Sequence, residues 1–337
     1  MSNKLVSINI LTYNGLDLIE QCLNSVLEQT YPNIEVLVVD NGSEDKTLEK
    51  IQITKSKFRR FPIKIIENKK NLGFSAGHNI GIRESKGEYV LCLNQDVVLD
   101  KDFIKYAVEA IEKDNKIGAV QGKLYKISNL KSQISKILDV TGLIIFKNRR
   151  VVARGQGEED KGQYKAGEIF GADGAAPLYC RSALEDIKLN GEYFDENFFM
   201  YKEDVDLAWR MRLYGWKAIY EPRAFGYHPR GAGERVVKNY ISVALERRKL
   251  SEFAKFCSFK NQRLMQIKNE LSALFFRDFY RIITKEIVAW LYVFLFEKYG
   301  WKSIRDLIKQ APKAWQKRKI IMQRKQVGAK EMKRWFI

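Results

Sequence analysis

Nearly continuous apolar strands that end in polar residues alternate with helices through the first third of the chain, and this pattern limits the fold most strongly. Runs of Val, Ile and Leu without polar alternation are typical of parallel strands that helices cover on both faces. The predicted strands are 5–11, 34–39, 63–67 and 89–93, and the predicted helices are 16–29, 46–55, 76–85 and 100–113. The sequence therefore predicts an α/β fold with a mostly parallel, Rossmann-like sheet.

Polar residues gather where three of these strands end. They are Thr12-Tyr13-Asn14, Asp40-Asn41 and Asn94-Gln95-Asp96. In sheets of this class, ligands bind beyond the carboxyl ends of the strands. These residues are therefore the first candidates for a binding site.

Two of the candidates suit a nucleotide. Asp40 can accept hydrogen bonds from ribose hydroxyls or a base N–H, although it can equally cap the next helix. The segment 71–79 places Gly73 and Gly77 around a helix start, where the backbone can approach a phosphate closely. An ordinary glycine-rich turn would explain the same segment, so neither feature identifies a nucleotide site alone.

A divalent cation is a further candidate ligand. Asp96 can offer a carboxylate, and Mg²⁺ and Mn²⁺ often take one or two carboxylates together with diphosphate oxygens. His228, one of only two histidines, lies in a predicted loop and would complete the site with Asp96. A strand-end turn and an unremarkable loop histidine are the alternatives.

Three carboxylates within four residues follow a segment rich in aromatic side chains. They are Glu203, Asp204 and Asp206. Repulsion between like charges raises carboxyl pKa values, which suits a general base. On a helix, Glu203 and Asp206 share a face while Asp204 points elsewhere. The alternative is a solvated acidic first turn that complements the helix dipole.

Taken in order, these segments resemble the family 2 inverting glycosyltransferases, which have the GT-A fold, and within them the bacterial rhamnosyltransferase branch. Each segment is weakly specific alone, but the ordered set covers most of residues 5–230. The segments that carry the resemblance are 9–14, 38–43, 71–79, 94–96, 203–207 and His228.

The resemblance implies a role for each matching residue. Asp204 is the expected catalytic base, and Asp96 and His228 are the expected ligands of Mg²⁺ or Mn²⁺. The expected donor-binding residues are Thr12, Asn14, Asp40, Asn71, Gly73, Gly77, Asn79, Asn94, Asp96 and Asp173. The expected neighbours of the acceptor and the base are Glu203, Asp206 and Arg230.

The chain departs from the family pattern in one place, at Asn94. Asn94 stands where the family often has an acid, which leaves Asp96 as the only carboxylate in that motif; the rhamnosyltransferase branch often shows this Asn. Asp173 lies in a small-residue loop, 171–176, where the family approaches the donor sugar. A buried turn is an equal explanation for Asp173.

The implied function is that of an inverting, metal-dependent hexosyltransferase in bacterial cell-surface polysaccharide synthesis. Rhamnose from dTDP-rhamnose is the first expectation for the donor, and a UDP-hexose is the alternative within the family. The expected acceptor is a saccharide or a polyprenyl-diphosphate-linked molecule.

Positive charge is concentrated at the end of the chain. Residues 251–337 carry 20 Lys and Arg against 7 Asp and Glu, which is +13 of the total of +18. Four of the six Trp are also there: Trp290, Trp301, Trp315 and Trp335. Aromatic residues mixed with Lys and Arg on short helices suit the interface of an anionic membrane.

These features predict two regions, a glycosyltransferase domain over 1–250 and a basic amphipathic helical region over 251–337. Residues 270–337 are expected on the anionic membrane surface, as a peripheral attachment at the cytoplasmic face. Packing on the catalytic core and formation of a homodimer are the alternatives for this region.

The sequence gives less support to two other classes of protein, those that span a membrane and those that bind nucleic acid. The longest apolar run, 287–296, has ten residues, whereas a membrane-spanning helix needs about 20. A nucleic-acid-binding protein could use the basic, aromatic tail, but its charge would then be expected near the proposed pocket. Four scattered cysteines without a Cys-x-x-Cys pair fit a reducing cytosol and give no zinc or disulfide pattern.

Overall fold

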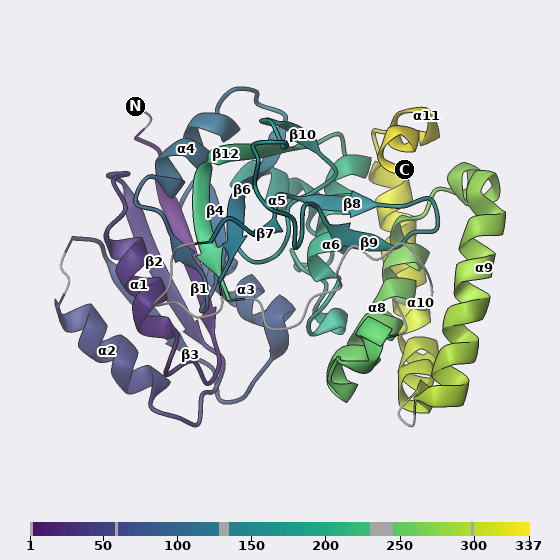
Figure 1. Ribbon diagram of the computed structural model, residues 1–337, viewed down its shortest axis with the longest axis horizontal. Helices are drawn as coiled ribbons and strands as arrows, with labels where there is room; N and C mark the ends of the chain where they lie inside the picture. The colour runs from purple at the N-terminus through teal and green to yellow at the C-terminus, as the bar shows by residue number, and fades with distance from the viewer. Residues whose placement is uncertain (1–2, 58–59, 128–134, 230–244, 298–299) are drawn as a thin grey trace.

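The computed structural model describes residues 3–57, 60–127, 135–229, 245–297 and 300–337. Most of the chain forms an α/β domain. Three long helices stand along one side of it, α8 Glu252–Asn269, α9 Ser272–Phe296 and α10 Gly300–Arg324 (Figure 1).

The first half of the sheet is parallel, as predicted. Its strands lie in the order β4-β1-β2-β3. Their bounds are β1 Val6–Thr12, β2 Ile34–Asp40, β3 Ile63–Glu67 and β4 Tyr89–Asn94. The connecting helices are α1 Ile19–Leu27, α2 Thr47–Lys57, α3 Gly73–Glu84 and, after β4, α4 Phe103–Ile111. All eight predicted elements are therefore confirmed, with ends shifted by up to three residues.

Helices cover both faces of this sheet. Since alternate residues of a strand point to opposite sides, each strand contributes side chains to two apolar clusters. Leu91 and Leu93 of β4 pack in one apolar cluster with residues of α1 and α4. Val90 and Cys92 of the same strand pack in a second cluster with residues of α3, α5 and α6. The continuous apolar run of β4 follows from this double burial.

The second half of the sheet is mixed, which corrects the expectation of a mostly parallel sheet. Strand β11 lies antiparallel between β4 and β6, while β12 is parallel to β6. The cause is the loop 171–176, which lies beside the carboxyl end of β4: the Asn94 amide donates to the Ala175 carbonyl at 3.0 Å. The strand that follows this loop must therefore run back along β4 in the opposite direction.

Two long strands, β6 and β12, and several short strands make up this half. The strands are β5 Val98–Leu99, β6 Ile117–Lys126, β7 Leu138–Val140, β8 Leu143–Ile145, β9 Val151–Ala153, β10 Gly167–Ile169, β11 Pro177–Cys180 and β12 Lys217–His228. The helices are α5 Arg181–Ile187, η1 Glu196–Phe198 and α6 Glu203–Leu213. Helix α6 confirms the predicted helix with an acidic first turn.

The C-terminal region is helical, as expected. Its elements are α8 Glu252–Asn269, α9 Ser272–Phe296, α10 Gly300–Arg324, α11 Ala329–Met332 and η2 Lys333–Trp335. Ser251 is the N-cap of α8, and its hydroxyl accepts a hydrogen bond from the Ala254 amide at 3.1 Å. Residues 249–251 separate α8 from the helical residues 245–248.

Part of this region shares a core with the α/β domain. Leu264 and Met265 of α8 and Ile321 of α10 are buried in the cluster that also holds Trp209 of α6. Phe336, next to the last residue, stacks edge-on against Trp209 with 5.5 Å between ring centroids. Packing on the core, one of the two alternatives for the tail, is thus present, while the proposed boundary at residue 250 stays a prediction.

None of the helices in the described part of the chain combines the length and the apolar character that crossing a bilayer requires.

Candidate active site

A cavity of about 290 Å³ lies at the carboxyl edge of the sheet, next to the start of α6. Five residues that the sequence singled out line it together: Asn94, Asp173, Glu203, Asp204 and His228. Strands β8 and β9, helix α8 and the bend before α8 contribute further lining residues, among them Leu143, Val151, Val152, Ala153, Leu250, Ala254 and Ser258. The site is therefore built from both halves of the sheet and from the C-terminal region.

Asp204 is held at the first turn of α6, facing the loop 171–176. Its carboxylate accepts hydrogen bonds from the Gly174 amide at 3.1 Å and from its neighbour, the Val205 amide, at 2.7 Å. The residue before the helix, Lys202, has a left-handed φ of 73°, so the chain turns sharply into α6. This turn places Asp204 on the cavity wall.

The surroundings of Asp204 make it a better base than an ordinary aspartate. Burial raises the pKa of Asp204, and the charge of Asp173 raises it further, to about 6. A carboxylate with this pKa is still ionised at neutral pH but binds a proton more strongly than usual. The residue that was expected to be the base thus has a raised pKa, but the causes are burial and Asp173 rather than repulsion from Glu203 and Asp206, as the sequence had predicted.

Glu203, the neighbour of Asp204, is a different kind of group. It is buried, and burial together with the charge of Asp204 raises its pKa well above the ordinary value. Its Oε2 atom has no hydrogen-bond partner, which disfavours a charge there. Of the two adjacent carboxyl groups, Asp204 is therefore the one suited to accept a proton at neutral pH.

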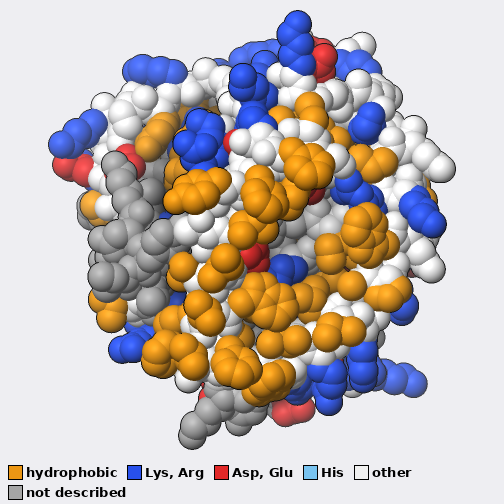
Figure 2. All heavy atoms as spheres, turned by 90° about the vertical axis from the view of Figure 1, so that its right-hand side faces the viewer, with side chains coloured by type: hydrophobic (Ala, Val, Ile, Leu, Met, Phe, Trp, Pro, Cys, Tyr) orange, Lys and Arg blue, Asp and Glu red, His pale blue; other side chains and the backbone are white. Residues whose placement is uncertain are grey.

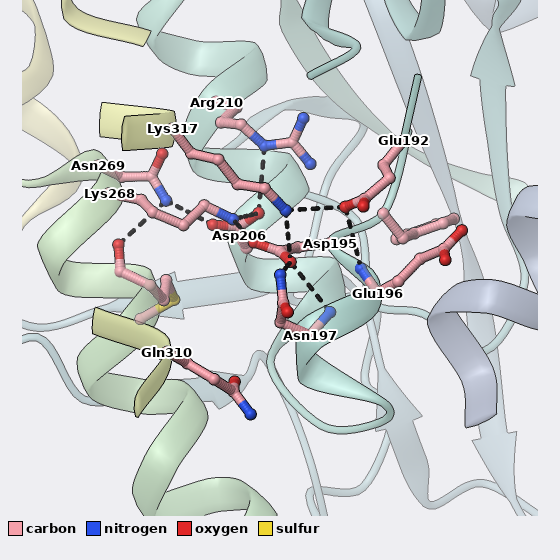
Figure 3. A network of polar contacts seen from close by, with 12 residues as sticks. Glu192, Asp195, Glu196, Asn197, Asp206, Arg210, Lys268, Asn269, Gln310 and Lys317 are labelled. Atoms are coloured by element: carbon pink, nitrogen blue, oxygen red, sulfur yellow. Dashed lines mark hydrogen bonds and ion pairs between the residues drawn. The ribbon is translucent and has the colours of Figure 1, made fainter. Parts of the chain in front are cut away.

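Asp206 is not part of the cavity, which corrects its predicted place beside the acceptor. Its side chain is fully buried and accepts hydrogen bonds from Lys268 at 2.8 Å and Asn269 at 2.7 Å, both on α8, and from Arg210 at 3.1 Å (Figure 3). The helical spacing explains the difference, because Asp206 lies on the face of α6 that packs against α8. Asp204, two residues earlier, points elsewhere, as predicted.

The contacts of Asp206 belong to a larger buried network that joins the α/β domain to the tail. Lys268 also contacts Asp195 at 2.5 Å, and Lys317 of α10 contacts Asp195 and Glu192, both at 2.8 Å (Figure 3). Although burial opposes it, Lys268 and Lys317 hold the pKa of Asp195 below its usual range. Each buried charge thus has an opposite partner, as stability requires.

Asp96 and His228 do come together, as the metal hypothesis requires. Their atoms Oδ2 and Nε2 are 3.3 Å apart, and His228 Nδ1 lies 2.8 Å from a carboxylate that sequence reasoning missed, Asp139 Oδ2. Burial lowers the pKa of His228, but hydrogen bonds to Asp139 and Asp96 outweigh this and raise it to about 9. A carboxylate behind a histidine is the arrangement that orients metal-binding imidazoles.

This donor set fits a divalent cation that shares its remaining ligands with a substrate. One carboxylate and one imidazole suit Mn²⁺ or Mg²⁺ completed by diphosphate oxygens. In the described residues, no three His, Cys, Asp or Glu side chains form a complete cluster for a metal. The protein part of such a site is therefore Asp96 and His228, with Asp139 behind the histidine.

The residues expected to bind the nucleoside line up at the carboxyl edge of adjacent strands. Thr12 and Asp40 are paired in the register of β1 and β2. The Thr12 hydroxyl donates to Gln95 at 2.5 Å, and Asp40 accepts from the amide and the hydroxyl of Ser43. Asn14, in a left-handed turn, accepts from the Glu44 amide at 2.9 Å. Their nucleoside role stays a prediction.

The segment 71–79 packs closely against neighbouring parts of the protein. A side chain at Gly73, which has a φ of +84°, would lie 2.6 Å from the Phe199 carbonyl, and one at Gly77 would lie 2.3 Å from Leu11. Asn79 is fully buried and bonds both the amide and the carbonyl of Phe194. Protein atoms therefore occupy the space beside these three residues, and their predicted contacts with the donor stay a prediction.

Asn71 likewise supports the local turn. Its side-chain oxygen accepts from the Gly73 amide at 2.8 Å and from Asn41 at 3.0 Å. Arg230, the last predicted neighbour of the base, lies outside the described residues. Lys202 and Tyr201 line the cavity and were not predicted, because nothing in their sequence context distinguishes them from surface residues.

The sequence profile of glycosyl transferase family 2 matches residues 7–188. A curated relative, the poly-beta-1,6-N-acetyl-D-glucosamine synthase of Staphylococcus epidermidis, is 32% identical over 219 residues, which are 65% of this chain and 48% of the relative. The same enzyme of Staphylococcus aureus strain MSSA476 is 30% identical over 212 residues, 63% of this chain and 47% of the relative. The chain thus spans about half the length of these curated relatives.

Solved structures share the fold at low sequence identity. Residues 1–349 of TarS from S. aureus, in complex with UDP-GlcNAc, align with a TM-score of 0.57 and 20% identity over 91% of this chain and 81% of that chain. The mannosyltransferase PcManGT from Pyrobaculum calidifontis, in complex with GDP-Man and Mn²⁺, aligns with a TM-score of 0.52 and 17% identity over 94% and 84%. These likenesses confirm the predicted GT-A fold, with a mixed sheet.

Proposed function

Because this chain belongs to glycosyl transferase family 2, we propose that it is an inverting enzyme that moves a sugar from a UDP-sugar to a saccharide hydroxyl, with Asp204 as general base. The observation that carries the proposal is the half-buried Asp204 on the wall of a cavity, with a pKa of about 6 and with Asp173 and His228 in the same wall. These groups suit a reaction that must remove one proton and accommodate a diphosphate.

The expected reaction is a single displacement. Asp204 takes the proton from the acceptor hydroxyl while that oxygen forms a bond to the anomeric carbon of the donor sugar. The bond from the anomeric carbon to the diphosphate breaks on the opposite side, so the nucleoside diphosphate leaves with the electron pair and the configuration inverts. General bases in such positions contribute roughly 10²–10⁴-fold to the rate.

Asp96 and His228 would hold Mn²⁺ or Mg²⁺, and the cation would neutralise charge that develops on the leaving diphosphate. The role of this chain is to keep both ligands in place: Asp139 holds the imidazole of His228 through Nδ1, which leaves Nε2 directed toward Asp96. The metal dependence is supported by the Mn²⁺ in the PcManGT complex, which is a likeness of fold.

The donor assignment departs from the rhamnose that the sequence suggested. The relatives reported above are N-acetylglucosamine polymer synthases, and one structural neighbour is a complex with UDP-GlcNAc. We therefore place UDP-N-acetylglucosamine first among the donors to test, and dTDP-rhamnose finds no support among these relatives. By the same reasoning, the acceptor is a growing saccharide of a bacterial surface polysaccharide, and a polyprenyl-diphosphate link to it stays a prediction.

A donor screen tests this assignment. Isothermal titration with UDP-GlcNAc, UDP-glucose, dTDP-rhamnose and GDP-mannose, each in the presence of Mn²⁺, should show the tightest binding for UDP-GlcNAc. Tighter binding of dTDP-rhamnose by tenfold or more would restore the rhamnosyltransferase assignment. A matched series in EDTA reports whether the diphosphate needs the cation in order to bind.

A further inference from the structure

Helix α9 carries its apolar face on the outside of the molecule. Its large hydrophobic side chains with exposed fractions from 37% to 80% are Phe276, Phe279, Tyr280, Ile287, Val288, Trp290, Leu291, Phe294, Leu295 and Phe296. Most of them recur at intervals of three or four residues, so they form one stripe along the helix. We call these ten residues the α9 stripe. Figure 2 shows apolar side chains gathered over this side of the molecule.

The opposite face of α9 is fixed to the rest of the chain by charged and aromatic contacts. Asp278 lies 2.7 Å from Arg149 of the α/β domain, and Glu286 lies 2.6 Å from Arg263 of α8. The few fully buried apolar residues of α9 are Leu274, Ile282 and Val293. A surface helix normally buries its apolar side, but here the inward side is held by ion pairs and the apolar side remains in the solvent.

The stripe is larger than the apolar patches of ordinary surfaces. An aromatic side chain offers about 150–250 Å², so ten large residues that are roughly half exposed present on the order of 1,000 Å². The largest apolar patch on a typical monomer is about 300–600 Å². A surface of this size marks a binding site for something apolar.

The charges on α10 indicate what covers the stripe. Helix α10 packs mainly along α8 and meets α9 near its own first turn, where Trp301 packs on Phe294 with 5.2 Å between ring centroids. All of the exposed charged side chains on α10 are basic: Lys302, Arg305, Lys309, Lys313, Lys319 and Arg324. A second copy of this chain on the stripe would bring these cations toward their own equivalents, because the same surface faces itself in a twofold pair. An anionic lipid surface complements both the cations and the apolar stripe.

We propose that the α9 stripe, together with the exposed cations of α10, is a docking surface on which the protein lies flat on an anionic lipid bilayer. The stripe extends for about 30 Å along the helix axis, and helices of this type embed their apolar face by roughly 5–10 Å. Helix α8 lines the catalytic cavity through Ala254 and Ser258 and packs against α9 through Arg263. The cavity and the docking surface are therefore linked through α8. The cytoplasmic side of the membrane stays a prediction.

Vesicle flotation of the 337-residue chain tests the proposal. The wild-type protein should float with vesicles of phosphatidylglycerol and phosphatidylcholine and bind them at least tenfold more tightly than vesicles of phosphatidylcholine alone. In Leu291→Glu/Phe294→Glu, binding to the anionic vesicles should fall about a hundredfold. The matched control is Ile53→Glu on α2, an apolar residue of similar exposure, 44%, far from α9 in Figure 1; its binding should stay within twofold of wild type.

The cations are tested separately. In Lys309→Gln/Lys313→Gln, binding to the anionic vesicles should fall roughly fivefold for each cation removed, whereas binding to phosphatidylcholine should not change. Circular dichroism melts of every variant establish that each is folded before its binding is compared. None of these measurements needs a donor or an acceptor, so their outcome is independent of the proposed reaction.

Two results would overturn the proposal. One is a folded wild-type protein that stays with the soluble fraction at all vesicle concentrations. The other is a dimer in buffer that Leu291→Glu/Phe294→Glu converts to a monomer while vesicle binding is absent, which would assign the α9 stripe to a second copy of the chain.

Discussion

The buried carboxylate of Asp206 and the buried ammonium of Lys268 are 2.8 Å apart, and this contact joins the helix that carries Asp204 to the C-terminal region. Both side chains are fully enclosed, so the contact exists only while α6 and α8 are packed together. The C-terminal helices are thus a support of the candidate active site as well as a neighbour of it.

Replacement of Lys268 by Met should destabilise the protein by about 3–5 kcal/mol, because it leaves Asp206 and Asp195 buried with fewer opposite charges. Urea unfolding followed by tryptophan fluorescence measures this change. The control is Lys330→Met, which removes an exposed lysine and should alter the free energy of unfolding by less than about 0.5 kcal/mol. Equal stabilities of the two variants would show that the network contributes nothing.

The acid limb of the activity profile should report Asp204. Because this pKa is raised to about 6 and the base must be ionised to act, kcat/KM should fall tenfold for each pH unit below about 6. In Asp173→Asn the neighbouring negative charge is absent, so the midpoint should move to lower pH. A midpoint that stays in place or moves upward would contradict the coupling between Asp173 and Asp204.

Asp139 should act through His228 on metal affinity. Asp139→Asn should raise the Mn²⁺ concentration for half-maximal activity by roughly 10–100-fold, while the rate at saturating Mn²⁺ changes little. Titration of Mn²⁺ into chelator-treated enzyme measures both quantities. Asp114→Asn, at a surface carboxylate that contacts Lys217, serves as the control. Full activity of the wild type in EDTA would remove Asp96 and His228 from the metal role.

Gly73 should tolerate no side chain. Gly73→Ala faces both a left-handed φ of +84° and the Phe199 carbonyl at 2.6 Å, whereas Gly157→Ala faces a similar φ of +79° with no atom within 4 Å. The second variant should cost about 1–2 kcal/mol, which is the backbone penalty alone, and the first should cost clearly more. Thermal unfolding of both variants separates the two contributions, and equal costs would show that Phe199 moves aside freely.

The parts of this structure that local sequence can encode were predictable. Strands β1, β2 and β4 and the polar residues at their ends follow from apolar runs, and the separation of Asp204 from Asp206 follows from helical spacing. Asp139 could not be found this way, because it lies on a strand of three residues and meets His228 across 89 positions of sequence. Its role depends on the tertiary fold.

The charge of the tail shows a second limit on what the sequence could predict. Counting residues treats every Lys and Arg as a solvated charge, but Lys268 and Lys317 are buried against Asp195. The count therefore predicted a basic region correctly, but it could not show that Lys268 and Lys317 are buried and join the tail to the α/β domain. Composition likewise could not tell that the apolar side chains of α9 face outward, since the same pattern also describes a helix that buries them.

The most direct test of the account is Asp204→Asn, assayed for both donor binding and sugar transfer. This substitution keeps the size of the side chain and removes its ability to take a proton. Transfer to the acceptor should fall by roughly 10²–10⁴-fold, while the dissociation constant of UDP-GlcNAc with Mn²⁺ should stay within about threefold of wild type. Transfer at the wild-type rate, in a folded variant with intact donor binding, would contradict the assignment of Asp204 as the base.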